Sequence, residues 1–404
     1  MTPGRAAATE ADRQRAAFLH EMCELLWSSP ANGTGAGVSG ELIVLPNAAR
    51  PRLVVPPRRA VAAAAVRQYG EPRSRRSRIG VRALSVLMRS GLGGAVFRDR
   101  VTLRTPAGAP TIDSYLRSAL DRDVYLSMYL GAPRANRKPV LQMLDPDGRL
   151  IGFAKIGLGD LAGRLVEHER TALELVERAR LQAVRAPRVL HYGIWRDMPV
   201  LVLSALPVRD PRVPPAAGAL EAAMAEVAAV AGIERAPLAG TPYWSALVER
   251  LRSAGPSDAV SKLLGALVMV AARSGGVEIS FGAWHGDWTP WNMASTRSGL
   301  LLWDWERFAL GVPVGYDALH HWLQARVVPG GDAPRMAATR CMVEAPRILG
   351  SLVPDAGEAQ LVAFTYLAEL ATRQLADGQS AAGARLGDAG AWLVPAAVTG
   401  ATQL

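Results

Sequence analysis

The stretch HGDWTPWN, residues 285–292, decides the fold and directs the functional reading of this chain. It sets the carboxylate of Asp287 and the carboxamide of Asn292 five positions apart on one loop, so the two groups can converge on one point. A second carboxylate, Asp304, leaves the apolar run 300–303, which predicts a short strand. Two oxygen ligands with open coordination positions suit Mg²⁺ held jointly with substrate phosphates. The remaining carboxylate is then free to take a proton from an attacking hydroxyl.

This arrangement resembles the catalytic core of the aminoglycoside phosphotransferase family, small-molecule kinases with a protein-kinase-like fold. The resemblance covers roughly residues 120–330 and does not cover residues 1–115. Three motifs in the family's order carry it: the H-x-D-x-x-x-x-N loop at His285, Asp287 and Asn292, the strand-end D-W-E run at Asp304, Trp305 and Glu306, and the G-x-P…D segment at Gly311, Pro313 and Asp317.

The resemblance implies a role for each matched residue. Asp287 would orient and deprotonate the acceptor hydroxyl, and Asn292 and Asp304 would hold Mg²⁺. His285 would brace the loop, and Asp317 would tie it down through hydrogen bonds. The implied cofactors are ATP, or another nucleoside triphosphate, and Mg²⁺. The implied partner is a small molecule that offers a hydroxyl group.

A lysine in the preceding sheet region suggests the nucleotide clamp. Lys155 is one of only three lysines in the chain, and it lies inside an apolar strand pattern, where an unpaired ammonium would be costly. The helix predicted over residues 164–181 carries Glu169 as the only carboxylate on its inward stripe, whereas Glu167 and Glu174 fall toward solvent. Kinase-like enzymes use such a lysine–glutamate pair to hold the α- and β-phosphates, so we expect Lys155 to pair with Glu169.

Two further segments are candidates for nucleotide contacts. The hairpin loop 131–138 has one glycine, and Arg134 within it could contact phosphate or could belong to an ordinary basic loop. Ser204 and Leu206 follow the fifth predicted strand, where the resemblance places the hinge whose backbone pairs with adenine. There is no P-loop of the G-x-x-x-x-G-K-[ST] type.

Tryptophan is concentrated around the loop, with six of the ten residues of this type between positions 284 and 322. Trp288 and Trp291 are candidates for stacking on a sugar ring or another planar acceptor, and core packing is the alternative. The region 207–280 has about as many basic as acidic residues, so a polycationic aminoglycoside is not the default acceptor. A neutral or anionic hydroxyl compound fits at least as well.

Composition excludes several classes of protein. Half of the 404 residues are apolar, which argues against global disorder, and Cys23 and Cys341 are too few for a disulfide scaffold or a Cys-rich zinc site. The polar N-terminus lacks a signal core, and no apolar run reaches the roughly 20 residues that span a bilayer. These features predict a cytoplasmic protein without a transmembrane segment.

The pattern of elements predicts an α+β, two-lobed, protein-kinase-like fold. A small antiparallel sheet with one helix after its third strand is expected first, and a larger helical lobe follows. We expect a basic α/β extension over residues 1–115 that packs on the sheet lobe, a nucleotide-binding lobe over 116–206, and a helical lobe with the catalytic loop over 207–404.

Two alternatives to the kinase hypothesis stay open at this point. One is a catalytically dead kinase-like scaffold, although every required polar residue is present. The other is a protein that binds nucleic acid or an anionic surface through residues 50–104, which hold 14 arginines against Glu71 and Asp99. That segment has few aromatic residues and no recognisable base-reading module, so we favour a structural role for it.

Overall fold

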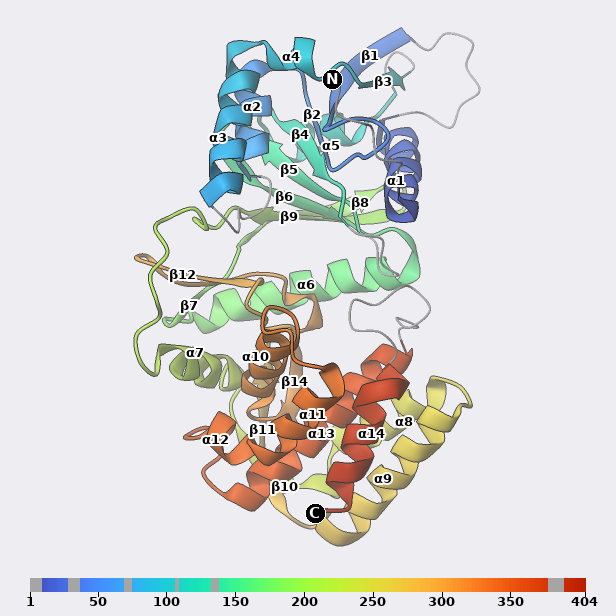
Figure 1. The fold of residues 1–404 in the computed structure, drawn as a ribbon, viewed down its shortest axis with the longest axis vertical. Coiled ribbons are helices and arrows are strands. Elements are labelled where there is room, and N and C mark those ends of the chain that lie inside the picture. Colours follow the sequence, from blue (N-terminus) through green and yellow to red (C-terminus); the bar gives the residue numbers. More distant parts are fainter. Residues whose placement is uncertain (1–8, 28–36, 69–74, 106–108, 132–137, 377–388) are drawn as a thin grey trace. The chain divides into compact units, whose positions relative to one another are not determined.

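The computed structural model describes residues 9–27, 37–68, 75–105, 109–131, 138–376 and 389–404 (Figure 1). It has a mixed α+β fold and divides into two compact units. The first unit comprises Met1–Glu167 and Val189–Ala205, and the second comprises His168–Arg188 and Leu206–Leu404. Within the described ranges, no helix is both long and apolar enough to cross a bilayer.

The first unit is built on an eight-stranded sheet in which every neighbouring pair is antiparallel. Its strand order is β3-β1-β2-β4-β5-β6-β9-β8. The strands are β1 (Gly37–Leu45), β2 (Leu53–Val55), β3 (Arg100–Thr105), β4 (Tyr125–Tyr129), β5 (Val140–Leu144), β6 (Leu150–Ile156), β8 (Val189–Trp195) and β9 (Met198–Ser204).

Apolar side chains cover both faces of this sheet, because alternate residues of its strands point to opposite sides. Leu42 and Val44 pack with α1 (Glu10–Trp27) and α5 (Ile112–Leu120) on one face. Ile43 and Leu45 pack with α2 (Arg59–Gln68) on the other. The helices α3 (Arg75–Ser90) and α4 (Gly93–Val96) lie beside α2 (Figure 1).

The turn between β5 and β6 shows how local sequence sets the register. The carboxylate of Asp145 accepts hydrogen bonds from the backbone N–H groups of Asp147 and Arg149, at 2.9 and 2.8 Å. Gly148 closes the turn with φ +84°, and a Cβ at this position would lie 2.6 Å from the carbonyl oxygen of Ala60. Only glycine satisfies both conditions, so the predicted Asp-Pro-Asp-Gly turn is confirmed.

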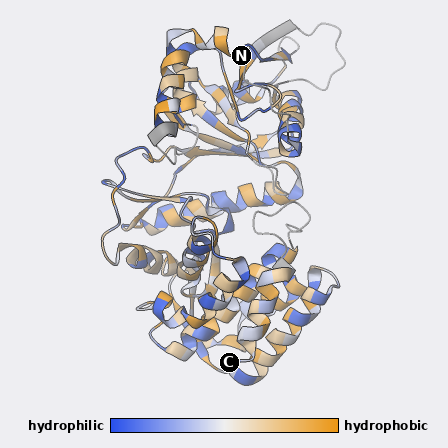
Figure 2. Ribbon diagram, viewed as in Figure 1, coloured by the Kyte–Doolittle hydropathy of each residue, from blue (hydrophilic) through white to orange (hydrophobic). Residues whose placement is uncertain are grey.

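The helix α6 (Gly159–Ala179) begins in the first unit and ends in the second. It carries polar and apolar stretches along its length (Figure 2). Its predicted inward stripe is confirmed, since Glu169 is fully buried and Glu167 is exposed. The stripe residues Leu165, Ala172, Leu173 and Val176 are buried as well.

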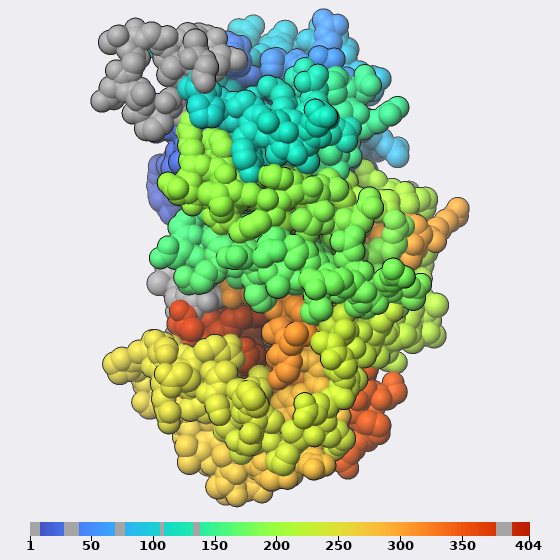
Figure 3. All heavy atoms as spheres, turned by 180° about the vertical axis from the view of Figure 1, so that it is seen from behind, coloured from blue at the N-terminus to red at the C-terminus, as the bar shows by residue number. Residues whose placement is uncertain are grey.

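The second unit packs helices around two three-stranded sheets, with orders β10-β11-β14 and β12-β13-β7. Residues coloured yellow, which include α8 and α9, form much of its surface in Figure 3. Its strands are β7 (Val184–Arg185), β10 (Glu234–Pro237), β11 (Glu278–Trp284), β12 (Met293–Thr296), β13 (Gly299–Leu302) and β14 (Ala309–Pro313). Its helices are α7 (Ala219–Ala228), α8 (Pro242–Ser253), α9 (Asp258–Ser274), α10 (Tyr316–Val327), α11 (Pro334–Val343), α12 (Ala345–Leu349), α13 (Ala356–Ala376) and α14 (Ala389–Ala401), with 3₁₀ turns at Leu238–Gly240 and Trp305–Arg307.

The helix α13 is the centre of the second unit's core. Nearly all of its side chains from position 358 to 372 are buried, including the polar ones of Glu358, Thr365 and Glu369. Glu369 is neutralised by Arg250 of α8, whose guanidinium donates two hydrogen bonds of 2.7 and 2.5 Å to the carboxylate. A helix held this firmly is a suitable support for the loops that pack against it.

The structure corrects several sequence-based expectations. The sheet expected to be small has eight strands, because residues 37–105 contribute three of them. The short strand expected at 300–303 is β13, but the region expected to be otherwise helical also holds β10, β11, β12 and β14. The helical segment after α10 is divided at Glu344 into α11 and α12, and Pro346 supplies no N–H to continue the ladder.

Candidate active site

The loop after β11 approaches the backbone of a second segment so closely that one position must be glycine. Gly286 has φ +85°, and a Cβ there would lie 2.0 Å from the carbonyl oxygen of Arg307. The left-handed conformation and the close approach both exclude a side chain. The chain of the predicted loop therefore makes a sharp turn at Gly286, immediately before Asp287.

A buried carboxylate anchors the same turn. Asp317, in the first turn of α10, accepts hydrogen bonds from the backbone N–H groups of His285 and Gly286, at 2.7 and 3.2 Å. Burial raises the pKa of Asp317 to about 7, although the two N–H donors oppose this shift. This geometry matches the tying role expected for Asp317.

His285 is a packed core side chain. It has no exposed surface, and burial lowers its pKa to about 4, so the ring is neutral at physiological pH. Its ring meets that of Trp305 edge-on, with centroids 4.6 Å apart. Its Nδ1 accepts a hydrogen bond of 3.2 Å from the backbone N–H of Asp287. His285 thus braces the loop, as expected.

Asp287 presents its carboxylate in a defined orientation. Asn292 Nδ2 donates to Asp287 Oδ2 at 2.8 Å and to the Asp287 carbonyl oxygen at 3.0 Å. His320 Nε2 lies 3.1 Å from Asp287 Oδ1. The side chain keeps 34% of its surface exposed, so its remaining lone pairs are accessible. A held, partly exposed carboxylate is the geometry that a general base requires.

Two residues of α13 support this loop from behind. Arg373 Nη1 donates to the carbonyl oxygen of Gly286 at 2.7 Å, and its guanidinium lies over the Trp284 ring, 5.6 Å from the ring centre. The hydroxyl of Tyr366 lies 3.0 Å from His320 Nδ1. The Arg373 contact joins the loop directly to α13, and the Tyr366 contact joins α13 to His320 of α10, which in turn contacts Asp287.

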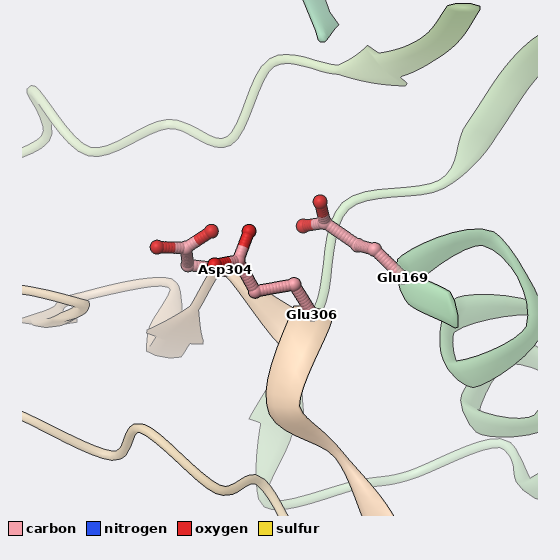
Figure 4. A group of neighbouring side chains, drawn as sticks. All are labelled: Glu169, Asp304 and Glu306. Atoms are coloured by element: carbon pink, nitrogen blue, oxygen red, sulfur yellow. The ribbon is translucent and has the colours of Figure 1, made fainter. Parts of the chain in front are cut away.

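A group of three carboxylates lies at the end of the β12–β13 hairpin. Oxygens of Asp304, Glu306 and Glu169 lie within 4.8 Å of one another, and Figure 4 shows all three side chains converging. Glu169 also accepts a 3.2 Å hydrogen bond from the backbone N–H of Trp305. Asp304 itself has φ +74°, an uncommon value for a residue with a side chain, which turns the chain directly after the strand.

The donor set at this position fits Mg²⁺. The amide nitrogen of Asn292 is engaged with Asp287, so its carbonyl oxygen is the atom left for a cation. Asp304 supplies a carboxylate, and Glu169 and Glu306 add negative charge next to it. Carboxylate and amide oxygens are the ligands that hard cations prefer. Asn292 and Asp304 would therefore hold the ion together with nucleotide phosphates.

The predicted nucleotide-binding residues fall in different parts of the chain. Lys155 lies in β6 of the first unit, opposite Val140 and Leu201 on the neighbouring strands. Ser204 ends β9 in the first unit, and Leu206 is the first residue of the second unit's long segment. The pairing of Lys155 with Glu169 stays a prediction. Arg134 lies outside the described residues.

The two tryptophans of the loop differ in exposure. Trp288 has no exposed surface and meets His285 edge-on, with centroids 6.1 Å apart. It offers no face to an acceptor, so its proposed stacking role is corrected to core packing. Trp291 is 41% exposed and keeps the stacking role open.

Sequence reasoning missed two side chains of this site. Glu306 belongs to the D-W-E run at residues 304–306, so its motif is recognisable in the sequence, but its place in the carboxylate group was not predicted. His320 lies in the His320–His321 pair of α10, one helical turn beyond Asp317. The i, i+3 spacing from Asp317 was the available signal that His320 faces the loop.

Comparison with known proteins returns matches to solved structures only. No family model matches the chain, and neither does a curated protein. It is similar to a protein described as a fructosamine-3-kinase from Haemophilus somnus 129PT, with 9% identity and a TM-score of 0.45 over 72% of this chain and 96% of that one. For a choline kinase from Streptococcus pneumoniae the identity is 13%, the TM-score 0.43 and the coverage 70% and 90%. For a thermostable mutant of an aminoglycoside phosphotransferase in complex with ADP and hygromycin B, the identity is 13% and the TM-score is 0.46, over 72% of this chain and 98% of that one. These three solved structures are each at most 13% identical to the chain, and the likeness concerns the fold.

Proposed function

We propose that this chain is an ATP- and Mg²⁺-dependent phosphotransferase that moves the γ-phosphate to a hydroxyl group of a small molecule. The observation that carries the proposal is the carboxylate of Asp287. It is 34% exposed, is held at one oxygen by Asn292 and at the other by His320, and sits on a loop anchored by Asp317.

Asp287 performs the proton transfer in this reaction. It accepts a hydrogen bond from the acceptor hydroxyl, aligns its oxygen with the γ-phosphorus, and takes the proton as the new O–P bond forms and the bond to ADP breaks. Mg²⁺, when bound, neutralises charge on the phosphates. Asn292, on the loop, and Asp304, directly after β13, would place it.

The first unit supplies the nucleotide contacts in this proposal. Lys155, held by Glu169, would contact the α- and β-phosphates, and the backbone around Ser204 and Leu206 would pair with the adenine edge. Support comes from the full burial of Glu169, since a carboxylate so placed requires a positive or hydrogen-bonding partner.

The acceptor is a sugar-like or other hydroxylated metabolite in our proposal, and aminoglycosides remain within the class to be tested. Arg373 contacts the loop through the carbonyl oxygen of Gly286, and a positive charge beside the loop disfavours a polycationic ligand. We place the protein in the cytosol, in keeping with the free, buried thiols of Cys23 and Cys341.

The test is an ATP-consumption screen across sugars, aminoglycosides, amino alcohols and nucleosides. We expect ADP formation that depends on one of these acceptors and disappears when EDTA removes Mg²⁺. If no acceptor raises ADP formation above the level without protein, while the protein is folded and binds Mg·ATP, the phosphotransferase proposal is wrong and the scaffold alternative holds.

A further inference from the structure

A buried histidine and tyrosine stand directly behind Asp287. His320 of α10 is 1% exposed, and its two ring nitrogens have different partners: Nε2 lies 3.1 Å from Asp287 Oδ1, and Nδ1 lies 3.0 Å from the hydroxyl of Tyr366. Tyr366, in α13, is fully buried. The three side chains therefore form one chain of hydrogen bonds from the exposed carboxylate to the core.

The direction of each hydrogen bond in this chain follows from the chemistry of the groups. A carboxylate can only accept, so His320 must donate from Nε2–H to Asp287. A neutral imidazole carries one N–H, so Nδ1 is then an acceptor and Tyr366 must donate its hydroxyl proton to it. Burial lowers the pKa of His320 and raises that of Tyr366, which keeps both groups neutral and this pattern intact.

The ring of His320 is also fixed by packing. Trp284 meets it edge-on, with centroids 6.4 Å apart and planes at 88°, and the Tyr366 ring lies 6.0 Å away at 81°. Tyr316 packs edge-on against Tyr366 at 5.7 Å. A ring held on several sides and bonded at both nitrogens cannot flip without breaking two hydrogen bonds.

We infer that His320 and Tyr366 are positioning residues that fix the orientation of the Asp287 carboxylate: Asp287 selects the Nε2–H tautomer of His320, and the Tyr366 hydroxyl holds the ring at Nδ1. This inference rests on the proposed phosphotransferase function for its catalytic meaning. His320 engages Oδ1 and Asn292 engages Oδ2, so the carboxylate plane is set from both sides. Its exposed lone pairs then have one direction in which to meet the acceptor hydroxyl.

The direct test is independent of activity. In ¹⁵N-histidine-labelled full-length protein, the ring resonances of His320, assigned by their loss in His320→Gln, report the tautomer. We expect Nε2 to be protonated and Nδ1 to be an unprotonated acceptor, and we expect Tyr366→Phe to keep this tautomer but to shift the Nδ1 resonance, because the variant lacks the hydroxyl that donates to Nδ1. His20, whose side chain is 78% exposed and lies 3.3 Å from Glu24, serves as the exposed control. A protonated Nδ1, a charged ring, or an unchanged Nδ1 resonance in Tyr366→Phe would overturn the inference.

The functional readout uses ATP turnover with the acceptor that gives the highest rate in the screen. His320→Leu should lower kcat by roughly 100-fold, the effect of misplacing a reacting group by about 1 Å, with an unchanged KM for ATP. His320→Gln, which retains an N–H donor, should recover most of the rate. Equal rates in the Leu and Gln variants at equal melting temperature would contradict a positioning role. Absence of wild-type turnover would refute the proposed function but leave the tautomer result standing.

Discussion

Single side chains determine how the candidate site works, and the clearest case is Asp304. It leaves β13 with a positive φ and places its carboxylate beside those of Glu169 and Glu306. Carboxylate oxygens gathered this closely are ligands that a hard cation prefers. In the proposed function, Asp304 of the Asp-Trp-Glu run would therefore help to hold Mg²⁺.

We therefore predict that Asp304→Ala abolishes protection by Mg·ATP. Mg·ATP should raise the melting temperature of the wild type and leave that of Asp304→Ala unchanged, because the variant lacks the carboxylate that holds the ion. Asp258→Ala is the matched control, since Asp258 is an exposed carboxylate paired with Lys262. Equal protection of both variants by Mg·ATP, measured by thermal shift, would show that Asp304 is not a ligand.

Substitutions of the two tryptophans of the loop should affect different properties: protein stability for Trp288 and acceptor binding for Trp291. Trp288 is fully buried, so Trp288→Ala should lower the free energy of unfolding by about 3–5 kcal/mol. Trp291 is 41% exposed, so Trp291→Ala should leave stability nearly unchanged and raise the KM for the acceptor. Denaturant unfolding and steady-state kinetics measure the two effects. A large stability loss in Trp291→Ala with an unchanged KM would exclude the stacking role of Trp291.

At the scale of elements, the sequence predicts a structural element best where a single local pattern determines its conformation. The Asp145–Gly148 turn, the burial of Glu169 on α6 and the H-x-D-x-x-x-x-N loop follow from turn chemistry, helical period and a linked motif. The eight-stranded sheet does not follow from such a local pattern, because the pairing of β2 with β4 joins residues about 75 positions apart in the sequence. The spacing of His320 from Asp317 on α10 is a local signal, but its contact with Tyr366 on another helix is not recorded in any local pattern.

The strands of the N-terminal segment should be integral to the first unit. β2 pairs directly with β4, and α1 and α2 bury apolar residues on the two faces of the sheet. Deleting residues 1–115 should therefore expose both faces and give an insoluble or dye-binding product, detected by sedimentation and a hydrophobic dye.

A point variant tests the same claim without truncation. Leu26 of α1 has no exposed surface, so Leu26→Ala should lower the free energy of unfolding by about 2–5 kcal/mol. Glu24→Ala, at a side chain that is 65% exposed, is the control and should be nearly neutral. A soluble, equally stable truncated protein would instead show that the segment is a separate module and would revive the nucleic-acid hypothesis.

At the scale of the whole molecule, histidines with a lowered pKa give stability a pH dependence. Desolvation lowers the pKa values of five histidines: His168, His191, His285, His320 and His321. Each therefore binds fewer protons when folded than when unfolded near pH 6.5, so unfolding takes up protons. Asp317 opposes this, because its raised pKa of about 7 makes the folded state bind the extra proton between about pH 4 and 7.

Five histidines outweigh one aspartate, so stability should fall as the pH drops from about 6.5 toward 4. The melting temperature measured between pH 7.5 and 5 should therefore decrease on acidification. His321→Gln removes one of the titrating groups and should reduce the proton uptake on unfolding by about one. A melting temperature that rises on acidification would show that Asp317 and other carboxylates dominate.

The central claim is that Asp287 accepts the proton of the attacking hydroxyl. The most direct measurement is the kcat of Asp287→Asn against wild type, with the acceptor that gives the highest rate in the screen and with Mg·ATP in excess. Asparagine keeps the shape of the side chain but cannot accept the proton, so kcat should fall by roughly 10²–10⁴-fold while folding and Mg·ATP binding are retained. A kcat close to that of the wild type would contradict the account.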